Sequence, residues 1–92
     1  MHEAIYFKPE ADLTFHSVNK VHAQLKRALE NHPATLVLDL SEVRHCDSAG
    51  LALLIEARKW CQRTSQTFHI EGMGVELRAL AEFCGVSALL FP

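Results

Sequence analysis

The stretch of chain at residues 45–50 holds the side chains whose types and spacing are best suited to chemistry. It reads His-Cys-Asp-Ser-Ala-Gly and lies where an apolar run ends and a helical pattern begins. A serine at such a junction can accept a hydrogen bond from an unpaired amide of the first helical turn, so Ser48 is predicted to be the helix N-cap. Asp47 beside it is favoured by the positive end of the helix dipole. As a cap, Ser48 would contribute about 0.5 to 2 kcal/mol to stability.

The same serine is a candidate phosphorylation site. A phosphoryl group on Ser48 would add about −1.5 to −2 charges at a helix start, where backbone amides point outward. It would change the surface offered to a partner and leave the fold intact. Gly50, two residues later, allows another backbone to approach this turn closely. On the residues alone, the capping role and the phosphorylation role both stay open.

Other patterns that would indicate catalysis or a metal site do not occur in the sequence. The six histidines have none of the spacings typical of zinc ligands. His45 and Cys46 are neighbours in an extended segment, so their side chains point to opposite faces and cannot easily form a nucleophilic pair. No glycine-rich loop for nucleotide phosphates is present. Asp39, at the end of an apolar strand, is predicted to brace the next loop. We therefore expect no enzyme activity, no metal and no other cofactor.

Composition narrows the remaining classes of function. The chain has 92 residues, 49% of them hydrophobic and 22% charged, which suits one globular domain with one core. No apolar run reaches the roughly 20 residues of a membrane helix, and the first residues do not resemble a signal peptide. Three cysteines without a C-x-x-C pair fit a reducing compartment. A net charge of −2 without a basic cluster argues against nucleic acid. We expect a cytoplasmic protein that binds another protein and does not insert into the membrane.

The elements that position residues 45–50 alternate between strand and helix patterns. Strands are predicted at residues 5–8, 13–15, 35–40 and 66–70, and helices at residues 17–29, 51–61 and 77–84. The resulting order, β-β-α-β-α-β-α, predicts one α/β domain over residues 1–92. Its sheet should be mixed, with about four strands and with helices on one face. Trp60 is placed in the core, because it lies at helical spacing from Leu53 and Ala57.

Two stretches of the sequence resemble the signature of STAS domains. Residues 38–43 read LDLSEV, and residues 46–54 read CDSAGLALL. The resemblance implies a STAS-like fold over nearly the whole chain and a regulatory binding role. In the anti-anti-sigma factors of this family, the serine that matches Ser48 is phosphorylated by a partner kinase. Those proteins usually carry Gly-x-Leu-Asp before the first helix, whereas residues 11–14 here read Ala-Asp-Leu-Thr.

The shorter build of the chain and residues 13–15 and 50–54 are more similar to the MlaB-type members of the family. These members are the STAS subunits of Mla phospholipid-transport ABC systems. The resemblance implies that the chain binds the cytosolic ATPase subunit of such a transporter and supports its assembly and activity. It would then lie in the cytoplasm, at the inner membrane through that complex. An anti-anti-sigma factor switched by phosphorylation of Ser48, with a serine kinase or anti-sigma factor as its partner, is the alternative.

The partner surface is predicted on residues 47–50 and on one flank of the helix that follows. Each residue turns about 100° around a helix axis, so Leu51 and Ile55 fall outside the arc that faces the sheet. They share a flank with Ser48 and Ala52, which would place a small apolar patch beside the loop. The predicted partner-binding residues are Asp47, Ser48, Ala49, Gly50, Leu51, Ala52 and Ile55.

Overall fold

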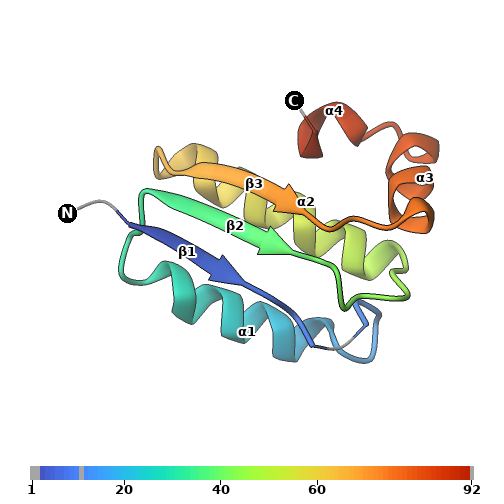
Figure 1. Ribbon diagram of the computed structural model, residues 1–92, viewed down its shortest axis with the longest axis horizontal. Coiled ribbons are helices and arrows are strands. Elements are labelled where there is room, and N and C mark those ends of the chain that lie inside the picture. Colours follow the sequence, from blue (N-terminus) through green and yellow to red (C-terminus); the bar gives the residue numbers. More distant parts are fainter. Residues whose placement is uncertain (1–2, 11, 92) are drawn as a thin grey trace.

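A computed structural model describes residues 3–10 and 12–91, which form three strands and four helices (Figure 1). The strands are β1 (Ala4–Phe7), β2 (Thr35–Asp39) and β3 (Thr67–Glu71). The helices are α1 (Val18–Leu29), α2 (Ser48–Arg63), α3 (Val75–Phe83) and α4 (Ser87–Leu90). The predicted α/β class and the three long helices are confirmed.

The sheet is built around β2, which pairs in parallel with β1 on one side and β3 on the other. Val37 lies in register with Tyr6 of β1 and with His69 of β3. Parallel neighbours need a crossover, and α1 and α2 supply the two crossovers here. Right-handed crossovers that step in the same direction put both helices on one face of the sheet. The helices α1 and α2 accordingly contact each other.

The predicted second strand and the mixed sheet of about four strands are wrong. Leu13 forms only an isolated parallel bridge with Cys46, and the described residues form three strands, all parallel. The chain leaves extended geometry at once, because the hydroxyl of Ser17 accepts a hydrogen bond from the Thr14 N–H at 3.1 Å. The short helix α4 was not predicted either, since a single turn of four residues has no apolar repeat to reveal it.

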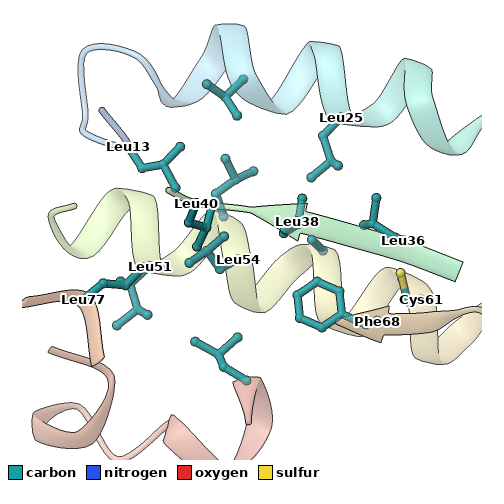
Figure 2. Close-up of a cluster of buried hydrophobic side chains, with 14 of the residues drawn as sticks. Leu13, Leu25, Leu36, Leu38, Leu40, Leu51, Leu54, Cys61, Phe68 and Leu77 are labelled. Carbon is teal, nitrogen blue, oxygen red and sulfur yellow. The ribbon is translucent and has the colours of Figure 1, made fainter. Parts of the chain in front are cut away.

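The core lies between the sheet and the helices α1 and α2 (Figure 2). Leu36 and Leu38 point from β2 into this layer, as alternate residues of one strand must. Leu25 from α1 and Leu54 from α2 meet them there. At the other flank of α2, Leu77 of α3 belongs to the same buried cluster.

Candidate functional site

Two segments meet at the start of α2. We call residues 44–50 the capping loop and residues 12–17 the entry segment, since the latter leads into α1. The backbone N–H of Leu13 donates to the carbonyl of His45 at 3.0 Å, and the N–H of Asp47 donates to the carbonyl of Leu13 at 3.1 Å. These two bonds hold the segments side by side although they are far apart in the sequence.

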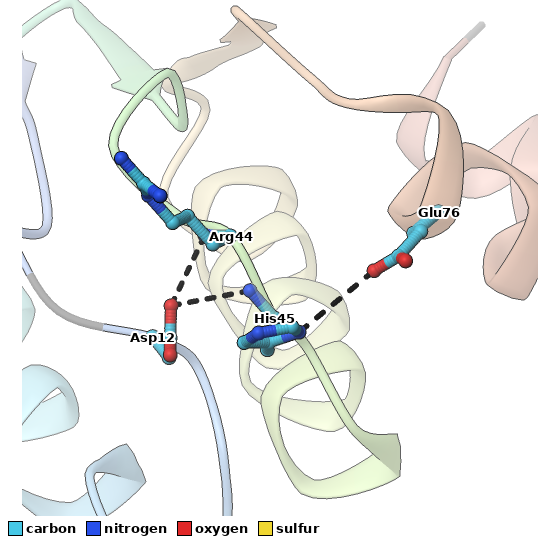
Figure 3. A network of polar contacts seen from close by, with 4 residues as sticks. All are labelled: Asp12, Arg44, His45 and Glu76. Atoms are coloured by element: carbon cyan, nitrogen blue, oxygen red, sulfur yellow. Dashed lines mark hydrogen bonds and ion pairs between the residues drawn. The ribbon is translucent and has the colours of Figure 1, made fainter.

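Asp12 binds the capping loop from the entry segment (Figure 3). Its Oδ1 accepts hydrogen bonds from the backbone N–H groups of Arg44 and His45, each at 3.1 Å. On the other side of the capping loop, Nδ1 of His45 lies 3.9 Å from Oε2 of Glu76 in the first turn of α3. Both side chains of that pair are largely exposed, so it contributes little to stability. It does show that the capping loop is a neighbour of α3.

Asp47, and not Ser48, is the N-cap of α2. Its Oδ1 accepts hydrogen bonds from the N–H groups of Ala49 and Gly50 at 2.9 and 3.1 Å. Its Oδ2 accepts from the N–H of Phe15 in the entry segment at 2.9 Å. The prediction that Ser48 caps the helix is therefore wrong, because the helix begins at Ser48 itself and the preceding residue has the extended backbone of a cap.

These hydrogen bonds lower the pKa of Asp47 below its ordinary value of 3.8, with the Phe15 N–H the largest cause and the Gly50 N–H next. A carboxyl whose pKa is lower in the folded state stabilises the fold fully above its ordinary pKa. That contribution is lost as the pH falls through the folded value. We expect the urea midpoint to drop as the pH falls below about 5, through the lowered pKa of Asp47, and to drop less in Asp47→Asn. Equal pH profiles for the two proteins would contradict this role for Asp47.

A prediction for Ser48 follows from the corrected cap. Its side chain is exposed and makes no hydrogen bond with the described residues, so Ser48→Ala is expected to change the free energy of unfolding by less than about 0.5 kcal/mol. Asp47→Ala, measured in the same denaturant titration, should be clearly destabilising. If Ser48→Ala is the more damaging of the two, the assignment of the cap is wrong.

Gly50 lies where the entry segment crosses α2, and it is buried. A Cβ at this position would lie 2.1 Å from the carbonyl oxygen of Leu13. The close backbone approach predicted for Gly50 is thus present, and the backbone that approaches it is that of Leu13.

The predicted partner-binding residues do not all lie on the surface. Ser48 and Ala52 are exposed, whereas Gly50 and Leu51 are buried. Ile55 is half-buried against the core cluster. The expectation of an exposed apolar flank is wrong for Leu51, which is only 4% exposed, because the cluster that buries it extends to α3.

Two contributors to the site were missed by reasoning from sequence. The sequence predicts a strand at Phe15, but this residue is 74% exposed and its N–H donates a hydrogen bond to Asp47. Asp12 is not among the predicted site residues, although its carboxylate binds the backbone of the capping loop. The signal in the sequence that could have indicated an exposed Phe15 is that it is an isolated aromatic residue at the end of a strand pattern of only three residues. No local pattern reveals Asp12, because its partners lie more than thirty residues away.

Asp39 and Cys46 have the surroundings of structural residues. Oδ1 of Asp39 accepts a hydrogen bond from the N–H of Ser41 at 2.9 Å, and bonds with Ser41 lower the pKa of Asp39. This is the loop-bracing role that the sequence predicts. Burial raises the pKa of the Cys46 thiol to about 11, so the thiol is protonated at neutral pH and is a poor nucleophile.

Among residues 3–10 and 12–91, no three His, Cys, Asp or Glu side chains gather closely enough to hold a metal ion. None of the helices that these residues form has both the length and the apolar character needed to span a bilayer.

The described residues, with three parallel strands and four helices, have an α/β fold like that of STAS domains, which are typically non-catalytic binding modules. The family model described as "Mlab, STAS domain" matches residues 10–91. The chain therefore belongs to the MlaB-type STAS family.

One solved structure with the same fold is that of the Bacillus cell fate determinant SpoIIAA in its phosphorylated form. The two chains are 15% identical, with a TM-score of 0.73, over 99% of this chain and 83% of SpoIIAA. At that identity the likeness shows the fold alone. None of the curated proteins is significantly similar to this chain.

Proposed function

We propose that this protein is a regulatory subunit that binds the cytosolic ATPase of an Mla-type phospholipid-transport ABC system and supports its assembly and activity. Membership of the MlaB-type family supports this choice of partner. The observation that carries the proposal is the exposed start of α2, where Ser48 and Ala52 face solvent above a capping loop that two aspartates hold in place. A rigid surface of this kind loses little entropy on binding.

We define the docking surface as Phe15, Ser48 and Ala52. Phe15 is 74% exposed and is bound through its N–H to the same carboxylate that caps α2. Exposed aromatic residues held on a fixed backbone are typical anchors of protein interfaces. The exposed side chain of Phe15 contributes little to the fold and is accessible to a partner.

The helix α3 extends this surface. Val75, Ala79 and Phe83 are spaced four residues apart along it, so they lie on one side of the helix. Val75 is 86% exposed and Phe83 is 90% exposed. Because Glu76 in the first turn of α3 reaches His45, this apolar row begins next to the capping loop. A partner that covers the docking surface can cover the row as well.

The proposal is tested by co-expressing the chain with the Mla-type ATPase of the same organism. We expect the two proteins to co-purify, and ATP turnover by the transporter to fall when the chain is left out. Failure to co-purify at micromolar concentrations, with both proteins folded, would contradict the proposed function.

Ser48→Asp separates the binding role from the structural one. An acidic side chain is favoured in the first turn of a helix, so the unfolding midpoint should stay near that of the wild type. The new charge lies on the docking surface and should weaken binding to the ATPase about tenfold. Isothermal titration checks the affinity, and wild-type affinity would exclude Ser48 from the interface.

An anti-anti-sigma factor is the second candidate function. The exposed hydroxyl of Ser48, directly after the loop aspartate, favours it, since a kinase can reach that oxygen. Mass spectrometry of the protein purified from its own cells tests this candidate. Phosphate on Ser48, together with no binding to the ATPase, would favour this function over the first.

A further inference from the structure

A groove runs between α1 and α2, on the flank of α2 that faces away from α3. It contains two cavities of about 150 and 250 Å³. His22, Leu53 and Glu56 line both cavities, so the two are parts of one groove. From Ala49 at one end to Trp60 at the other, the groove follows α2 for about 16 Å at 1.5 Å per residue.

An ion pair crosses the middle of the groove. Nε2 of His22 on α1 lies 3.4 Å from Oε1 of Glu56 on α2. Both side chains are about half exposed, and an exposed pair of this kind is worth little. An incoming segment can therefore displace it and join the two cavities.

The size of the cavity at the Trp60 end decides what it can hold. Its floor is apolar, formed by Leu25, Leu29 and Ala57. About 150 Å³ is well below the roughly 300 to 1,000 Å³ of pockets that bind small molecules. It matches one large apolar side chain, and the groove as a whole is long enough to receive a segment of a protein.

Trp60 supplies an unmet hydrogen-bond donor at this cavity. The indole Nε1 is buried and has no partner among the described residues. A buried donor without an acceptor costs free energy, which an acceptor from outside would recover. The predicted core position of Trp60 is thus only partly correct, because the ring also lines the groove.

The positive charges at the Trp60 end favour an incoming acceptor that is negatively charged. Lys26 lines the cavity from α1, and Lys59 and Arg63 lie on the solvent side of α2 beside Trp60. Within the described part of the chain none of these three cations forms an ion pair. A carboxylate that enters here would therefore meet the free cation of Lys26, with Lys59 and Arg63 nearby on the solvent side.

We infer that the α1–α2 groove receives an acidic amphipathic helix of the same ATPase subunit. One large apolar side chain of that helix fills the cavity beside Trp60, and an acidic side chain pairs with Lys26. A helix of about three turns matches the length of the groove, and helices laid into apolar grooves are a common mode of recognition. This inference rests on the proposed function and continues the docking surface into the groove, because Ala52 lines one of the two cavities.

Trp60 is the only tryptophan of the chain, so it can report on the groove directly. The chain is labelled with fluorotryptophan and titrated with unlabelled ATPase while its single fluorine NMR resonance is followed. We expect the resonance to shift as the complex forms. Lys26→Glu should weaken binding about tenfold at low salt. Lys20→Glu, the same charge change on another side of α1, should stay within about twofold of the wild type.

Four results would overturn the inference. If the complex forms on a sizing column and the resonance does not move, the groove is empty and only the proposed function survives. Equal weakening by Lys26→Glu and Lys20→Glu would mean that net charge, not the groove, sets the affinity. A shift that appears on concentrating the chain alone would make a second copy the occupant. Absence of any complex with the ATPase would overturn the inference together with the proposed function.

Discussion

Gly50→Ala is expected to lower the free energy of unfolding by about 3 kcal/mol, the upper end of the range for overpacked sites. A Cβ at Gly50 would lie 2.1 Å from the carbonyl oxygen of Leu13 and 2.7 Å from its Cβ. Both atoms belong to a residue that is fully buried and bound by its backbone to the capping loop. Neither atom can move aside without breaking the backbone hydrogen bonds that hold the entry segment against the start of α2.

Gly74→Ala is the matched control for that substitution. Gly74 has ordinary negative φ, and a Cβ there would meet nothing within 4 Å. Its replacement should cost less than about 1 kcal/mol, chiefly from its place at the start of α3. Urea titrations of both variants give the comparison. Equal midpoints for the two would show that the contact of Gly50 with Leu13 is not tight in the protein.

Ala52→Glu is expected to weaken binding to the ATPase about 100-fold, the largest effect on function among the substitutions considered. Ala52 is exposed on α2 one turn after Ser48, so the free protein tolerates a glutamate there. In the complex the same carboxylate would have to lose its water without gaining a partner. The unfolding midpoint should stay close to that of the wild type.

Ala23→Glu serves as the control for Ala52→Glu. It introduces the same side chain at an exposed position of a helix, on α1 and outside the docking surface. Its affinity for the ATPase should equal that of the wild type in isothermal titration. If Ala52→Glu also binds normally, or is unfolded, the start of α2 has been wrongly assigned as the interface.

The elements of the fold could be predicted where their patterns are long. The helices α1 and α2 each carry an apolar repeat over several turns, and β2 is an apolar run bounded by a proline and a polar loop. The prediction of a strand at residues 13–15 is wrong, because three residues of strand type do not show whether a neighbouring strand is present to pair with them. What decides there is the Ser17 hydroxyl, which turns the backbone toward α1.

The position of the site in the chain could be predicted from the sequence, but the roles and exposure of its individual residues could not. Asp47 and Ser48 are both good N-cap residues, and only the backbone at Asp47 shows which of them precedes the helix. Leu51 looks exposed on a helical wheel, since the wheel accounts for the sheet and not for the later packing of α3. The groove at Trp60 could not be predicted from the sequence, because it depends on the distance between α1 and α2.

Hydrogen exchange of the chain, alone and with the ATPase, tests whether the capped end of α2 binds the ATPase. We expect slower exchange on complex formation at the entry segment, at the first half of α2 and along α3. The backbone of β3 should be unchanged. Protection confined to the sheet edges, or no protection at the start of α2 in a stable complex, would contradict the claim that this protein binds its ATPase through the capped end of that helix.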